Sequence, residues 1–187
     1  MGTRHMIAVI LGGEPRIAQY GQWDGYPDGQ GVDVLAFAQG LSGGTIPGVL
    51  DKFKAQVAKC RFLPEDEANA IFQESPWMSR DTGSDILDLV MKAPDGLPLF
   101  SSYKFARNGL MCEWAYVLDL DQEQLEVYRG FGKGDAPEGE RFGGPGLDNS
   151  SGYGPVRLAK VYKFADLPSR GQFLADLQGE KDEDEAA

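Results

Sequence analysis

The stretch MIAVILGGEPRIAQY, residues 6–20, decides what kind of fold this chain can form. Its first six residues are continuously apolar and rich in β-branched side chains, which is typical of a buried strand. Gly12 and Gly13 follow directly, and a pair of glycines supports the tight turn of a β-hairpin. Residues 16–20 can then return as the second strand. The sequence therefore predicts a hairpin close to the start of the chain, and the other elements are placed around it.

Helices are expected after this hairpin. Apolar residues recur at helical spacing from Val32 to Leu41. Three more helices are predicted to begin at Pro47, at Pro64 and near Thr82. A proline suits the first turn of a helix, because the N–H that it lacks has no partner there. The last of the four helices should end before Pro94.

The second half of the chain returns to strands. Residues 111–120 alternate, with Cys112, Trp114, Tyr116 and Leu118 expected on one face and Glu113, Ala115, Val117 and Asp119 on the other. Residues 125–131 and 156–164 are predicted as further strands, and residues 168–178 as a closing helix. The sum is two hairpins plus a fifth strand, with helices inserted between the hairpins. This pattern predicts an α+β fold with a mostly antiparallel sheet of about five strands.

The length of 187 residues suits one compact domain, which we place at residues 1–178. Residues 130–155 are rich in glycine and show little apolar periodicity, so we expect a mobile loop within that domain. Acidic residues dominate residues 179–187, which is typical of a disordered tail.

The net charge of −11 argues against direct nucleic-acid binding, which needs a basic surface. No apolar run reaches the roughly 20 residues that a membrane-spanning helix needs. The first apolar run, at residues 6–11, is too short for a signal peptide, so we expect a cytoplasmic protein. Two cysteines, Cys60 and Cys112, indicate neither a disulfide framework nor a cysteine-based zinc site. No cofactor is expected.

The loop after the first hairpin carries more than turn geometry requires. Its segment RIAQYGQWDGYPDGQG, residues 16–31, combines amide and aromatic side chains at Gln19, Tyr20, Gln22, Trp23, Tyr26 and Gln30. Amides offer donors and acceptors without charge, and aromatic rings offer flat apolar area. We therefore predict a binding surface for a small polar ligand or a protein, which also includes Asp24, Arg80 and Glu113. The alternative is an aromatic corner that only packs the loop onto the sheet.

Catalytic candidates are few, because His5 is the only histidine. Cys112 could meet His5 across the sheet, but a cysteine on the expected apolar face is typical of a core residue. Glu113 is a candidate acid or base, although the residue types favour a structural salt bridge to Arg4, Arg80 or Arg107 over that role.

Asp24, the remaining catalytic candidate, shares its loop with Asp28 and Asp33. Their spacing does not fit a calcium-binding loop, since Tyr26 and Leu35 stand where two acidic ligands are needed. We therefore predict no metal site.

Four segments together resemble a family of proteins without an assigned activity, found in bacteriophages, prophages, bacteria and some fungi. These segments are residues 2–7 (GTRHMI), 18–31 (AQYGQWDGYPDGQG), 79–83 (SRDTG) and 112–121 (CEWAYVLDLD). The resemblance spans roughly residues 2–131. It implies a cytoplasmic protein that a mobile element could encode, and it transfers no catalytic residue.

Two functional hypotheses follow. The first is a binding protein for a small polar ligand or a host protein, including an inhibitor of a host defence system whose acidic surface meets a basic nucleic-acid channel. The second is a small hydrolase or amide-processing enzyme, with Cys112 or Thr3 as nucleophile and Glu113 or Asp24 assisting. An oligomeric structural protein is a third, less specific possibility, and the sequence leaves the oligomeric state open.

Overall fold

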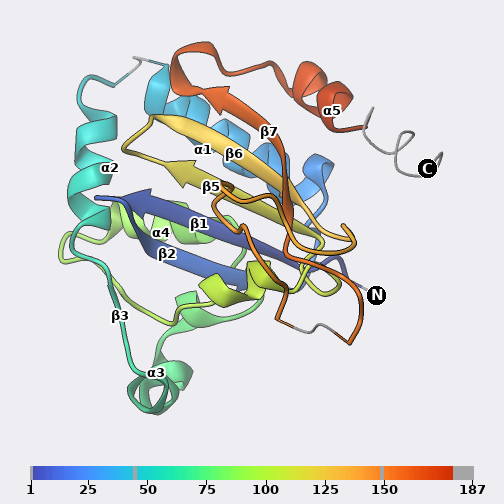
Figure 1. The fold of residues 1–187 in the computed structure, drawn as a ribbon. Coiled ribbons are helices and arrows are strands. Elements are labelled where there is room, and N and C mark those ends of the chain that lie inside the picture. The colour runs from blue at the N-terminus through green and yellow to red at the C-terminus, as the bar shows by residue number, and fades with distance from the viewer. Residues whose placement is uncertain (1, 44–45, 148–149, 179–187) are drawn as a thin grey trace.

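A computed structural model describes residues 2–43, 46–147 and 150–178, so the acidic tail expected at 179–187 lies outside the described residues. Its centre is a five-stranded sheet with the strand order β2-β1-β5-β6-β7 (Figure 1). The strands are β1 (His5–Leu11), β2 (Glu14–Gly21), β5 (Trp114–Asp119), β6 (Gln124–Arg129) and β7 (Arg157–Lys163). A second, short sheet joins β3 (Arg61–Phe62) to β4 (Pro98–Leu99) in parallel.

The central sheet is mostly antiparallel, as predicted. β1 pairs with β2 and β5 pairs with β6 as hairpins, and β7 adds to β6. The exception is β1 and β5, which are parallel, with His5 opposite Trp114. A parallel pair needs a long crossover connection, and the helices between the two hairpins supply it. The α+β fold class is therefore confirmed.

Helices cover one face of the sheet. They are α1 (Val32–Ser42), α2 (Val49–Val57), α4 (Asp85–Lys92) and α5 (Arg170–Gln178), while α3 (Glu65–Ile71) lies beside the short sheet. Short helical turns occupy Pro27–Gly31, Phe72–Glu74, Pro76–Met78, Tyr103–Arg107 and Phe164–Asp166. Residues such as Ile7 and Tyr116 on the sheet and Leu35, Phe53 and Ile86 on the helices form the larger core. Burying this apolar surface is the main stabilising term.

The other face of the sheet is covered by loops. Met6, Val117 and Tyr128 from the strands pack there with Phe142, which belongs to the glycine-rich segment at 130–155. The Phe142 and Tyr128 rings meet edge to face with their centroids 4.9 Å apart. The segment therefore contributes to this second core, and its mobility stays a prediction.

A charged network fixes the same segment to the sheet. The Arg141 guanidinium lies 2.5 Å from a carboxylate oxygen of Asp119 and 2.7 Å from one of Glu126, and both acids are buried. Tyr128 donates a further hydrogen bond to Glu126. Burial alone would raise the pKa of Glu126, but the hydrogen bonds from Arg141 and Tyr128 lower it below its ordinary value. Glu126 is therefore stable as a buried anion only while Arg141 is present.

None of the helices in the described part of the chain is long and apolar enough to cross a lipid bilayer.

Candidate functional site

Four segments that are distant in sequence meet at one end of the central sheet. Backbone hydrogen bonds join them: Gly25 N–H donates to Thr3 O at 3.1 Å, Gln22 N–H to Arg80 O at 3.0 Å, and Glu113 N–H to Arg4 O at 3.0 Å. The parallel pairing of β1 and β5 explains this arrangement, because it places the starts of both strands at the same end. These segments contain the sequence motifs at residues 2–7, 18–31, 79–83 and 112–121, which therefore lie together in one structural unit.

Glycines permit the close approach of these segments. A Cβ atom on Gly21 would lie 2.1 Å from His5 Cε1, and one on Gly25 would lie 2.8 Å from His5 Cβ. A Cβ on Gly2 would lie 2.2 Å from the Trp23 ring. Any larger residue at these positions would displace a ring or the backbone, which accounts for glycine at each of them.

The imidazole of His5 occupies the space that these glycines leave. It is 1% exposed, and neither ring nitrogen has a hydrogen-bond partner among the described residues. Burial lowers the pKa of His5 from 6.5 to about 4, and the nearby Thr3 backbone opposes that shift only in part. His5 is therefore a neutral, enclosed ring at neutral pH, without access to a substrate in solvent.

The pairing of Cys112 with His5, which the sequence left open beside the favoured core position of Cys112, is not formed. Met6 packs in the same core as Cys112, Ala115 and Val117. His5 precedes Met6 in β1, so strand alternation places it on the opposite, helix-covered face of the sheet. The expectation that Cys112 shares a face with Trp114 was therefore wrong. Its cause is that β5 begins only at Trp114, so the alternation of the strand does not extend back to residue 112.

Cys112 is fully buried, as expected for a core cysteine. Burial and the nearby Glu113 carboxylate raise the pKa of its thiol well above the ordinary value, which disfavours the nucleophilic thiolate. Glu113 pairs with Arg4 at 3.8 Å, one of the three arginines considered for it, and also accepts a hydrogen bond from the Arg4 backbone N–H. Thr3, the other candidate nucleophile, is only 4% exposed.

Two aromatic side chains of the predicted binding loop are open to solvent. Trp23 is 49% exposed and Tyr26 is 47% exposed. Trp23 is also held in place, because its indole N–H donates a 2.7 Å hydrogen bond to Asp81. The loop therefore presents aromatic area outward from a fixed position.

The amides of the loop divide between two roles. Gln19 is buried, and its Nε2 donates to the carbonyl oxygens of Tyr20 and Ser79. Gln30 Oε1 accepts a 2.6 Å hydrogen bond from the Ser84 backbone N–H. These two amides serve the main chain, as the alternative interpretation of the loop expected, while the exposed rings fit a binding surface.

Asp24 stands in the same loop with a positive φ of 56° and is exposed. The carboxylate of Asp33 has a raised pKa, first through burial and then through the nearby Asp24 and Asp85 charges. Within the described ranges, no group of three or more metal-ligating side chains comes together.

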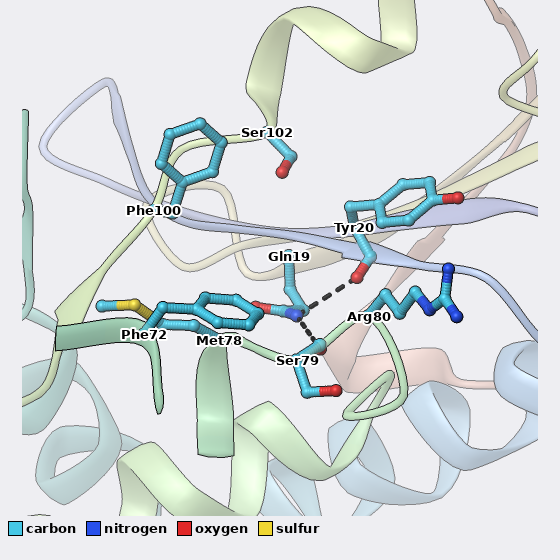
Figure 2. Close-up of a pocket in the computed structure, with 8 residues that line it drawn as sticks. All are labelled: Gln19, Tyr20, Phe72, Met78, Ser79, Arg80, Phe100 and Ser102. Atoms are coloured by element: carbon cyan, nitrogen blue, oxygen red, sulfur yellow. Dashed lines mark hydrogen bonds between the residues drawn. The ribbon is translucent and has the colours of Figure 1, made fainter. Parts of the chain in front are cut away.

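A pocket of about 380 Å³ adjoins the loop at the free edge of β2. Gln19 and Tyr20 from β2 line it together with Ser79 and Arg80. Its remaining lining residues are Phe72, Met78, Phe100 and Ser102. Figure 2 shows Phe72, Met78 and Phe100 gathered at one end of this pocket, with Tyr20 and Arg80 at the other end.

Arg80 is positioned by its neighbours. The Tyr20 hydroxyl donates a 3.0 Å hydrogen bond to Gln22 Oε1, and the same oxygen lies 3.5 Å from an Arg80 guanidinium nitrogen. Gln22 also donates its backbone N–H to Arg80 O. Three residues that the sequence nominated for binding thus form one connected group beside the pocket.

The sequence did not identify the remaining lining residues of the pocket. They lie in short turns and at strand ends, where no periodic pattern indicates an inward face: Phe72, Met78, Phe100 and Ser102. Phe72 and Phe100 are 43% and 42% exposed, so both look like ordinary surface aromatics until the fold brings them to one pocket.

In comparisons with protein-family models, with curated proteins and with solved structures, nothing matched this chain.

Proposed function

We propose that this protein is a binding protein, and that its ligand enters the pocket beside Arg80. The observation that carries the proposal is the composition of this pocket: a cation and hydroxyls at one side, exposed phenyl rings at the other, and a volume of about 380 Å³. Binding sites for small molecules commonly combine an apolar wall with a few fixed polar groups in volumes of about 300–1,000 Å³.

The alternative of a hydrolase has less support. Its proposed nucleophiles, Cys112 and Thr3, are both enclosed, and the raised pKa of Cys112 disfavours attack by its sulfur. Glu113 is engaged by Arg4. Catalysis through these residues would require a rearrangement of the sheet end.

A protein partner is the second candidate, and the exposure of Trp23 and Tyr26 favours it. Tryptophan and tyrosine are enriched among residues that dominate the energy of protein interfaces. A host protein with a basic nucleic-acid channel would also complement the net charge of −11. In this version of the proposal, the protein is encoded by a mobile element and inhibits a host defence system.

Chemical-shift mapping on the labelled protein tests the small-ligand proposal. A library of small polar and amphipathic molecules is added, and binding compounds are expected to shift the backbone amide signals of Gln19, Tyr20 and Arg80. The variant Ser102→Phe fills the pocket and should abolish these shifts. Ser101→Phe is the matched control, since Ser101 is exposed and does not line the pocket. Shifts that map elsewhere, or that persist in Ser102→Phe, contradict the proposal.

A further inference from the structure

The edge of β2 is open at the pocket. On either side of the opening, Ala18 O accepts a 2.9 Å hydrogen bond from Ser102 N–H, and Gln22 N–H donates to Arg80 O. The alternation of an antiparallel ladder turns the backbone N–H and C=O of Tyr20 toward the same free edge. The Tyr20 carbonyl oxygen accepts a hydrogen bond from Gln19 Nε2, but the backbone N–H of Tyr20 has no hydrogen-bond partner within the described residues. One main-chain donor is therefore available at the pocket.

The charge of Arg80 is also unmatched. In the part of the chain that the structure describes, no acidic side chain forms an ion pair with it. Asp81, its neighbour in sequence, accepts the indole N–H of Trp23 instead. A guanidinium presents several N–H donors in a plane, and the two oxygens of a carboxylate match this geometry.

The opposite end of the pocket is apolar. Phe72 and Phe100 come from separate segments and keep 43% and 42% of their surface in solvent, and the buried Met78 lines the same pocket. Exposed aromatic rings that share one pocket offer flat area to an apolar group of similar size.

We propose that the ligand of this pocket is an amphipathic carboxylate with an aromatic or branched apolar body. The carboxylate accepts hydrogen bonds from the Arg80 guanidinium and the Tyr20 N–H, and the body lies against Phe72 and Phe100. This inference rests on the proposed function. A free carboxylic acid and the last residue of a peptide present the same chemistry to the site.

Isothermal titration calorimetry of the full chain tests the charge requirement with two probes of equal shape. N-acetylphenylalanine carries the carboxylate, and N-acetylphenylalaninamide replaces it with a neutral group. The acid is expected to bind at least about tenfold more tightly, because hydrogen bonds to an ionised group are the stronger ones. In Arg80→Gln this preference should disappear, while Arg170→Gln, on α5, should retain it.

A second pair of probes separates the two sources. Phenylacetate represents a free acid, and a hexapeptide ending in phenylalanine represents a peptide terminus. Tighter binding of either one supports the inference and assigns the source.

Two outcomes overturn the inference. If N-acetylphenylalanine and its amide bind equally and Phe72→Ala weakens both, the pocket binds apolar groups without requiring a carboxylate, and the inferred ligand is wrong. If neither N-acetylphenylalanine nor phenylacetate binds at concentrations up to about 10 mM, the proposed class of ligand, a carboxylate with an apolar body, is wrong. The proposed function is judged separately by the shift mapping, since that library is not restricted to acids.

Discussion

The buried ring of His5 should make the stability of this protein depend on pH in a defined window. The pKa of His5 is about 4 in the folded state, against 6.5 for an ordinary histidine. The unfolded chain therefore binds a proton at a higher pH than the folded one does. The stabilisation from neutral His5 is fully present above pH 6.5 and is lost as the pH falls from 6.5 toward 4.

The size of the effect follows from the shift. A difference of one pKa unit corresponds to 1.36 kcal/mol, so the full shift is worth about 3 kcal/mol. Linkage gives a loss of roughly 1 kcal/mol at pH 5.5 and roughly 2–3 kcal/mol at pH 4.5, relative to pH 8. No discount for solvent screening applies, because the ring is 1% exposed. For a domain whose total stability is about 5–15 kcal/mol, this loss is easily measured.

Urea denaturation at several pH values between 4.5 and 8 measures it, with His5→Phe as the reference. The phenyl ring keeps a flat side chain between Gly21 and Gly25 but cannot take up a proton. Carboxylates titrate in both proteins, so the difference between their unfolding free energies isolates His5. Because the chain has one histidine, the ring Cε1–H signal gives its pKa directly by NMR. A midpoint near 6.5, or a difference that stays constant across this range, refutes the reasoning.

Three further predictions concern the scaffold and the exposed loop. Arg141→Leu leaves Glu126 as an unpaired buried anion and should lower the unfolding free energy from urea denaturation by about 3–5 kcal/mol. Lys54→Met breaks a solvent-exposed pair and should lower it by at most about 1 kcal/mol, so similar losses would contradict the role assigned to the network. Gly21→Ala forces a Cβ into the His5 ring and should lower the melting temperature measurably by calorimetry, and an unchanged value would mean that the ring can move aside. Trp23→Ala should change the unfolding free energy by less than about 1 kcal/mol, because the ring is 49% exposed; a larger loss in urea denaturation would show that Trp23 mainly seals the sheet end.

The sequence was sufficient for the main elements and for the two hairpins, but not for the pairing of strands that are distant in the chain. Hydrophobic periodicity located both hairpins and the helices, because buried strands and amphipathic helices leave different periods in the chain. The parallel contact between β1 and β5 carries no such local signal, since it depends on the path of the chain through residues 22–113. Cys112 shows the same limit at smaller scale: alternation predicted its face, but the strand starts two residues later.

The sequence identified only the polar side of the candidate site, for a related reason. Tyr20 and Gln22 stand in a segment whose composition exceeds what turns require, so residue types alone marked them. Phe72 and Phe100 carry no such mark, because a single exposed phenylalanine is unremarkable until a second one lies beside it. Composition can nominate the polar side of a pocket, whereas its apolar wall is a property of the fold.

The exposed aromatics of this loop are more informative than exposure alone suggests. A mobile loop that exposes tryptophan must be ordered when it binds, and that ordering reduces affinity. In this protein the loop is already ordered by folding, because hydrogen bonds join Gln30 to the Ser84 backbone, Trp23 to Asp81, and the loop backbone to Thr3. The amides that bond the main chain and the exposed rings are therefore parts of one arrangement: the amides hold the main chain in place, and the rings stay in solvent at a defined position. Such preorganisation is what a recognition surface needs, whichever of the two partners it serves.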